Sequence, residues 1–190
     1  MINYIFEILD YWFQDLDFKR WFEDGYKYDK EIKYKFYDIL KLAENGKLNH
    51  WINTKHGYLA YIILLDQFSR HIYRNSYKAF SNDKIVYSFM IKGFKKYFDK
   101  LTAIEKLFAF MPIQHSETIN DKIYFYYILV NLIKYENDTD IYKNMLKHLL
   151  GHLNVLLNFN RYPTRNHLLN LKNTPSEIIY LKNRNKKFHY

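Results

Sequence analysis

Arginine is concentrated in two short segments of this chain. Four of the six arginines lie within residues 66–74 and 161–166, whereas 23 lysines are spread along the rest of the sequence. A guanidinium group presents a planar set of donors that matches a carboxylate or a phosphate, while a lysine ammonium is a hydrated point charge. The four clustered residues are Arg70, Arg74, Arg161 and Arg165. They are therefore the first candidates for binding an anion.

The first segment also contains an acid at helical spacing. Asp66, Arg70 and Arg74 follow one another at intervals of four residues, so they are expected to stack along one face of a helix. Apolar neighbours place this face in the core, where an isolated charge is very costly. One interpretation is an internal pair between Asp66 and Arg70 that orients the end of the helix. The other is that Asp66 and Gln67 position the arginines for a ligand.

Two histidines could supply proton transfer. His115 lies at an expected helix junction and is followed by Ser116 and Glu117. Helix capping would also explain Ser116 and Glu117, without any role in a ligand site. His152 lies near the end of the next long helix and precedes Arg161 by nine residues. The unperturbed pKa of histidine is close to neutral, so His115 and His152 are predicted as catalytic acid and base.

Together these side chains predict a phosphate pocket. The expected ligand is RNA or a nucleotide end, with a phosphorylated small molecule as a further possibility, and the expected chemistry is metal-independent transesterification or hydrolysis of a phosphodiester. The residues predicted to bind the ligand are Asp66, Gln67, Arg70, Arg74, Ser116, Glu117, Arg161, Arg165 and Asn166. Two alternatives remain. The first is a non-catalytic helical scaffold for an acidic peptide or protein partner. The second is that these groups form buried networks that lock helix pairs together.

Several other kinds of site are excluded or disfavoured. The chain has no cysteine, which excludes disulfides, thiolate zinc sites and cysteine nucleophiles. No cofactor or metal is expected, because the five glycines form no phosphate-binding loop and the arginines would repel a cation. A hydrolase that uses Ser116, a histidine and Asp66 is disfavoured, since the chain lacks a nucleophile elbow.

The overall composition suggests a cytoplasmic protein. No apolar run reaches the length of a membrane span, and the N-terminus carries Glu7 and Asp10 instead of the basic start of a signal peptide. The net charge of +9 is compatible with a nucleic-acid partner. A coding sequence rich in A and T would, however, also raise the number of lysines without any selection for binding.

Hydrophobic periodicity predicts an all-α protein of about seven to nine helices packed as antiparallel pairs. The expected helices cover residues 5–13, 17–22, 29–43, 54–73, 83–98, 103–111, 119–134 and 141–157, and a last one begins at residue 175. They are assigned to one domain, 1–181, followed by a basic, frayed tail, 182–190.

Local signals define several of these elements. The first helix is expected to bury one stripe, which consists of Ile5, Phe6, Ile8, Leu9, Trp12 and Phe13. Asp29 is expected to cap the third helix, whose apolar stripe runs from Ile32 to Ala43. Thr102 and Glu105 have the spacing of a capping box, and Pro112 is expected to end the helix that follows them. Thr174, Pro175 and Glu177 have the spacing of a helix start with a capping box.

The motifs resemble a family known as DUF924, whose function is uncharacterised. The resemblance runs from end to end through the segments 11–13, 21–22, 64–74, 79–80, 105–108, 111–117, 152–166 and 174–177. It implies an all-helical, tetratricopeptide-like fold and no particular reaction. The chain departs from the family pattern at several positions, namely Ser69 (usually proline), His71 (usually asparagine), Thr118 (usually aspartate), Thr164 (usually histidine), and Asn75 and Asn160 (usually glycines). The departures at 118 and 164 remove one acid and one imidazole from the predicted site.

Overall fold

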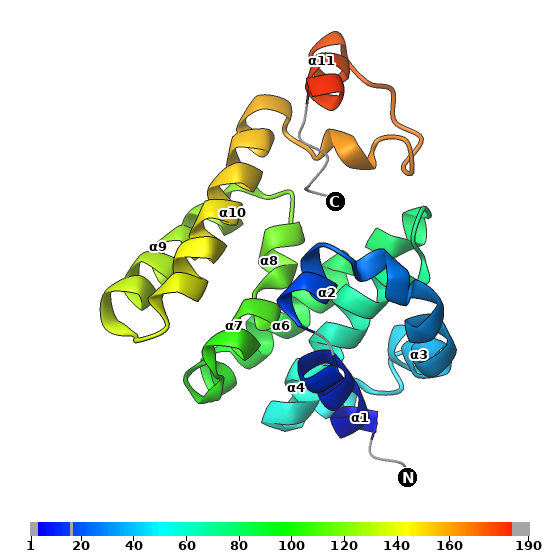
Figure 1. The fold of residues 1–190 in the computed structure, drawn as a ribbon, viewed down its shortest axis with the longest axis vertical. Coiled ribbons are helices and arrows are strands. Elements are labelled where there is room, and N and C mark those ends of the chain that lie inside the picture. Colours follow the sequence, from blue (N-terminus) through cyan, green and yellow to red (C-terminus); the bar gives the residue numbers. More distant parts are fainter. Residues whose placement is uncertain (1–3, 16, 184–190) are drawn as a thin grey trace. The chain divides into compact units, whose positions relative to one another are not determined.

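The computed structural model describes residues 4–15 and 17–183, and all regular secondary structure in these residues is helical (Figure 1). The all-α prediction is confirmed. Contacts between Cα atoms divide the chain into two compact units, Met1–His115 and Ser116–Tyr190. The assignment of residues 1–181 to one domain stays a prediction. Of the predicted tail, Lys182 and Asn183 belong to the last helix, and the remainder lies outside the described residues.

The first unit contains eight α-helices joined by shorter 3₁₀ and π turns, counted within its described residues. The α-helices are α1 (Tyr4–Asp10), α2 (Phe18–Phe22), α3 (Asp29–Glu44), α4 (Lys55–Ile62), α5 (Ser69–Ile72), α6 (Asp83–Tyr97), α7 (Ala103–Ala109) and α8 (Met111–His115). The π turns are η1 (Tyr11–Asp15) and η4 (Ile63–Phe68), and the 3₁₀ turns are η2 (Gly25–Tyr28), η3 (Asn49–Asn53), η5 (Tyr77–Phe80) and η6 (Phe98–Lys100).

The core of this unit is built around α4 and η4. Thr54 caps α4 by accepting a hydrogen bond from the backbone N–H of Gly57 at 3.1 Å. Every residue from 57 to 66 is buried, as expected for a helix that is apolar on all sides. The predicted central helix is therefore confirmed, although residues 63–68 are wound as a π turn between α4 and α5.

Helix α3 buries the predicted stripe, but its start differs from the prediction. Ile32, Phe36, Ile39, Leu40 and Ala43 are all buried. The N-cap is Tyr28, and Asp29 is the first helical residue. The prediction of Asp29 as the cap was wrong, because its carboxylate accepts hydrogen bonds from side chains that lie 42 and 45 residues further along the chain.

Two other local predictions are corrected. Phe6, placed in the buried stripe of the first helix, is exposed and contacts the ring of His56. Pro112 does not end α7, which stops at Ala109; it is the second residue of α8. Proline fits there because the N–H groups of the first helical turn have no partner within the helix.

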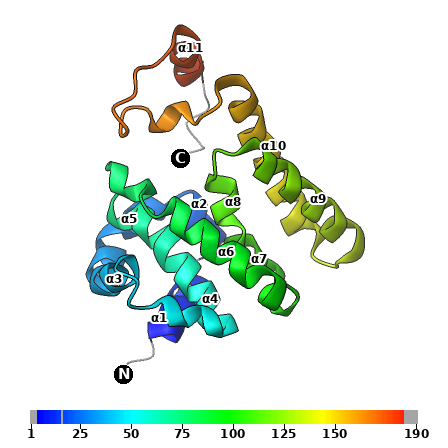
Figure 2. The ribbon, with the colours of Figure 1, turned by 180° about the vertical axis from the view of Figure 1, so that it is seen from behind.

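The second unit is a helix pair with a loop and a terminal helix. It consists of α9 (Ile119–Tyr135), α10 (Thr139–Phe159), the 3₁₀ turn η7 (Pro163–Arg165) and α11 (Pro175–Asn183). Helices α9 and α10 run antiparallel to each other (Figure 2) and bury Phe125, Leu129, Met145 and Leu149. The capping box at α11 is confirmed, because the N–H of Thr174 donates to Glu177 Oε2 at 2.7 Å and the N–H of Glu177 donates to Thr174 Oγ1 at 3.3 Å.

No helix in the described part of the chain combines the length and apolarity that a membrane crossing requires.

Two glycines in helices should respond oppositely to the same substitution. A Cβ added to Gly93 would lie 2.2 Å from the ring of Tyr58, whereas one added to Gly151 would meet nothing within 4 Å. We expect Gly93→Ala to lower the free energy of unfolding by about 1–3 kcal/mol through overpacking. Gly151→Ala should raise it by about 0.5–1 kcal/mol through helix propensity. Urea unfolding followed by circular dichroism measures both, and a change of the same sign at the two positions would contradict the packing of α6 on α4.

Candidate functional site

The carboxylate of Asp66 lies at the centre of a buried polar network in the first unit. Its Oδ1 is 2.7 Å from His115 Nδ1 and accepts a hydrogen bond from Arg70 Nη2 at 3.3 Å. Its Oδ2 accepts from Gln67 Nε2 at 2.5 Å. Asp66 is fully buried within the π turn η4, a local geometry that is frequent at functional sites. The structure therefore brings four of the predicted residues into direct contact.

Arg70 is held by contacts within the same unit. Its Nη2 donates to Asp83 Oδ1 at 2.9 Å as well as to Asp66, and its Nη1 donates to the carbonyl oxygen of Ala79 at 2.9 Å. The guanidinium also lies over the ring of Phe80, 5.5 Å from its centroid. Only 16% of the side chain is exposed. Arg70 thus neutralises buried carboxylates, as the first interpretation of its spacing proposed.

The pKa values of Asp66 and His115 describe how this network is protonated. Burial raises the pKa of Asp66, but the charges of His115 and Arg70 and the hydrogen bonds from His115 and Gln67 outweigh burial and lower it. Burial and the charge of Arg70 lower the pKa of His115, although Asp66 opposes them. At neutral pH the carboxylate is therefore ionised and the imidazole neutral. The shorter contact then requires Nδ1–H to donate to Asp66, which leaves the imidazole lone pair on Nε2. Arg70 Nε, 3.2 Å from the same Nδ1, cannot donate to it in this tautomer.

Arg74 belongs to a second, more exposed cluster. Helix α5 ends at Ile72, so Arg74 does not continue the predicted stack with Asp66 and Arg70. It instead donates through Nε to Asp29 Oδ2, and through Nη2 to Asp29 Oδ1 at 2.8 Å. His71 completes the cluster, with its Nδ1 2.8 Å from Asp29 Oδ1.

The protonation of this second cluster follows the same logic. Burial raises the pKa of Asp29, but hydrogen bonds from His71 and Arg74 lower it overall. Burial and Arg74 lower the pKa of His71, against the opposing effect of Asp29. Asp29 and His71 were missed as site residues. An acid at the start of a helix resembles a cap, and the only signal at position 71 was that a histidine stands where the family usually has asparagine.

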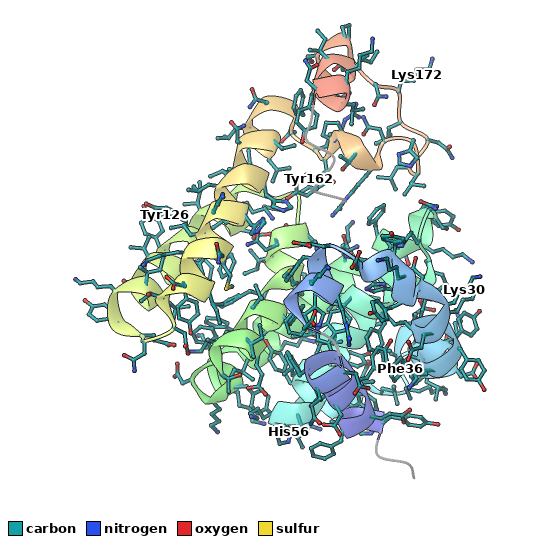
Figure 3. The ribbon with its side chains drawn as sticks, in the orientation of Figure 1. Lys30, Phe36, His56, Tyr126, Tyr162 and Lys172 are labelled. Carbon is teal, nitrogen blue, oxygen red and sulfur yellow. The ribbon has the colours of Figure 1, made fainter. Side chains whose placement is uncertain are left out.

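In the second unit, Tyr162 connects several predicted residues. Its hydroxyl donates to the carbonyl oxygen of Ser116 at 3.2 Å and lies 3.1 Å from Nδ1 of His152. Its backbone N–H donates to Glu117 Oε1, which also accepts from Arg165 Nη1, both at 3.4 Å. The guanidinium of Arg165 lies over the Tyr162 ring at 4.8 Å. Tyr162, labelled in Figure 3, was not among the predicted site residues, although it lies between two arginines in the sequence.

Arg161 forms the most regular ion pair of the second unit. Its Nε donates to Glu177 Oε1 at 2.7 Å and its Nη2 to Glu177 Oε2 at 2.8 Å, so one carboxylate occupies one edge of the guanidinium. Nη2 also donates to the carbonyl oxygen of Lys172 at 3.0 Å. The hydrogen bonds from Arg161 lower the pKa of Glu177 to about 2, against burial, and the backbone of Thr174 assists.

The remaining predicted residues have local partners. The hydroxyl of Ser116 donates to Asp121 Oδ2 at 2.7 Å and accepts from the N–H of Thr118 at 3.1 Å. The N-cap of α9 is Thr118, whose side chain makes no capping hydrogen bond, so Ser116 does not cap this helix. Asn166 is buried and donates through Nδ2 to Asn173 Oδ1 at 2.7 Å. His115 belongs to the first unit and His152 to the second, so their sharing of one pocket stays a prediction, as does proton transfer by either histidine.

Each of the four clustered arginines contacts an acidic side chain. The pairs are Arg70 with Asp66 and Asp83, Arg74 with Asp29, Arg161 with Glu177, and Arg165 with Glu117. The described residues contain no group of three or more histidines and acids placed to hold a metal ion. The carboxylates thus hold the guanidinium groups in fixed orientations.

Replacement of the buried carboxylate should be costly. In Asp66→Asn the cationic Arg70 and the Nδ1–H of His115 lose a charged acceptor, so we expect the free energy of unfolding to fall by roughly 3–5 kcal/mol. Asp38→Asn, on the exposed side of α3, is the matched control and should change it little. Urea unfolding at pH 7 measures the stability of both variants. Equal losses of stability would show that the Asp66 carboxylate contributes no more to the fold than an exposed acid does.

The pair of Glu177 and Arg161 predicts a dependence of stability on pH. Because the pKa of Glu177 is lowered from 4.5 to about 2, its contribution to stability is complete above about pH 4.5 and disappears as the pH falls toward 2. The stability difference between the wild type and Glu177→Gln should therefore shrink over this range. Chemical unfolding at a series of pH values tests this, with the exposed Glu23→Gln as control. A difference that stays constant down to pH 2 would contradict the ion pair.

The comparisons with known proteins agree with this fold. A protein of unknown function from Agrobacterium tumefaciens, ATU0120, has a similar solved structure, with a TM-score of 0.83 and 24% sequence identity over 95% of this chain and 97% of that one. The search of curated proteins gave no match. The family model described as "Bacterial protein of unknown function (DUF924)" matches residues 8–185. The chain therefore belongs to the DUF924 family.

Proposed function

We propose that this protein binds a phosphate-bearing ligand, of which RNA or a nucleotide end is the expected class, through arginines that carboxylates hold in place. One observation carries the proposal. Arg74 and Arg161 each use Nε and Nη2 to bind a single carboxylate, while 37% and 29% of their side chains remain exposed. Neither Nη1 atom forms a hydrogen bond with the described residues, so this edge of each fork is available to a ligand.

The carboxylates make these arginines better ligands for a phosphate group. A free arginine loses side-chain entropy when it binds, whereas a guanidinium that already has a fixed orientation loses less. Its donors also match phosphate oxygens in a way that lysine cannot. Asp29 and Glu177 therefore fix the orientation of the two guanidinium groups, although each carboxylate cancels part of the positive charge that attracts an anion.

The surroundings of Arg74 favour a nucleic acid over an isolated phosphate. The turns η2 and η5 both pack against α5, whose end precedes Arg74, and they carry the exposed tyrosines Tyr26 and Tyr77. Exposed aromatic rings can stack on bases, which adds affinity that does not depend on sequence. Lys27 and Lys78 in the same two turns supply further positive charge.

Arg70 and Arg165 have a different role in this proposal. Their side chains are only 16% and 7% exposed, and both contact acids within their own units. They position the elements around the binding arginines and do not contact the ligand. The proposal concerns binding; catalysis by the histidines and a tetratricopeptide-like arrangement of the helices are further proposals that it does not require.

Binding of a short, fluorescently labelled single-stranded RNA across a salt series tests the proposal. We expect Arg74→Ala and Arg161→Ala each to weaken binding about tenfold, in line with the loss of hydrogen bonds to a charged group. Arg74→Lys should also weaken it, because lysine keeps the charge but lacks the fork. Lys30→Ala, an exposed site labelled in Figure 3, removes the same charge and should have a much smaller effect.

Control measurements distinguish specific RNA binding from loss of the fold, from non-specific charge attraction and from binding of an acidic peptide. Circular dichroism confirms that each variant is folded. Equal losses in Arg74→Ala and Lys30→Ala would show that only non-specific charge attracts RNA, and would overturn the proposal. No binding of RNA, together with arginine-dependent binding of a polyglutamate peptide, would replace it with the acidic-peptide scaffold.

A further inference from the structure

His71 has one ring nitrogen that no protein group uses, beside the arginine proposed to bind phosphate. Its side chain is only 10% exposed, and its Nδ1 lies 2.8 Å from Asp29 Oδ1 and 3.3 Å from Arg74 Nη2. The other nitrogen, Nε2, forms no hydrogen bond with residues 4–15 and 17–183, and it is not one of their buried polar atoms that lack a partner. Nε2 therefore contacts solvent, although the ring packs against Trp12.

The backbone of Gly25 borders this edge of the imidazole. A Cβ added to Gly25 would lie 3.3 Å from Cε1 and 4.0 Å from Nε2 of His71. Any larger residue at position 25 would thus leave less room beside Nε2. The same turn, η2, packs against α5 and carries the exposed ring of Tyr26. A nucleotide bound at Arg74 would therefore lie near an aromatic ring as well as near His71.

Asp29 determines which proton the imidazole carries. The pKa values of Asp29 and His71 are both lowered, so at neutral pH the carboxylate is ionised and the imidazole is neutral. Nδ1–H then donates to Asp29 Oδ1, and the lone pair is on Nε2. Arg74 Nη2 cannot donate to Nδ1 in this tautomer. The cluster thus offers a ligand one acceptor, Nε2 of His71, and one donor, Nη1 of Arg74.

We propose that His71 makes this site select RNA over DNA, by accepting a hydrogen bond from a ribose 2′-hydroxyl while Arg74 binds a neighbouring phosphate. The inference rests on the proposed binding of RNA at Arg74. A phosphodiester has only acceptor oxygens, so it matches the guanidinium but not the lone pair of Nε2. The 2′-hydroxyl can donate to that lone pair, and it is the group by which a protein distinguishes RNA from DNA.

Fluorescence anisotropy at pH 7 with three single-stranded oligonucleotides of the same bases tests the inference. They are RNA, DNA and 2′-fluoro RNA, which keeps the sugar pucker of RNA but has no 2′ donor. We expect the wild type to bind RNA about fivefold more tightly than the other two, in line with one hydrogen bond. His71→Asn should lower the affinity for RNA to that for DNA and leave DNA binding unchanged. The asparagine amide can still donate to Asp29, but it does not extend as far as Nε2.

The possible outcomes separate this inference from the proposed function. Equal affinity of the wild type for RNA and DNA, or a preference that survives in His71→Asn, would overturn the inference. So would an equal loss of DNA binding in His71→Asn, since that loss would assign His71 a purely structural role. In the first two cases, binding that still depends on Arg74 would leave the proposed function standing. No binding of any of the three oligonucleotides would overturn both.

Discussion

The buried carboxylate of Asp66 is the constraint on which the first unit depends. A charge removed from water needs several donors, and Asp66 obtains them from Gln67, Arg70 and His115. Arg70 in turn contacts Asp83 and the carbonyl oxygen of Ala79. One acid thereby fixes the position of η4 relative to α5, η5, α6 and α8. Loss of any one contact would leave a charge or a polar atom without compensation.

The same principle appears in a more exposed form at the other acid–arginine pairs. Asp29 and Glu177 bind the Nε–Nη2 edge of Arg74 and Arg161, and these pairs are closer to the surface than Asp66 and Arg70. The buried Arg70 serves the fold because its Nη1 and Nη2 groups donate to acids and to a carbonyl oxygen of the same unit. Where the arginine is partly exposed, as in Arg74 and Arg161, the carboxylate orients a guanidinium whose Nη1 has no hydrogen bond to the described residues. Exposure, more than residue type, therefore separates the structural arginines from those proposed to bind a ligand.

The helices were largely predictable because their signals are local. The capping boxes at Thr102 and Thr174 and the stripe from Ile32 to Ala43 depend on residues three or four positions apart, and all are present in the structure. The errors occurred where a local signal had two explanations. Asp29 has the position of a cap and the role of an ion-pair partner. Pro112 is a residue type that often ends a helix, but here it lies in the first turn of the next helix, α8.

The sequence by itself determined the helical class, the family and the clustering of the arginines, because residue type and periodicity are local properties of the chain. It did not determine which acid meets which arginine. Asp29 and Arg74 are 45 residues apart, Arg70 and Asp83 are 13 apart, and Arg161 and Glu177 are 16 apart. Only the tertiary structure decided these pairs and their exposure, because they depend on how helices pack once their apolar faces are buried.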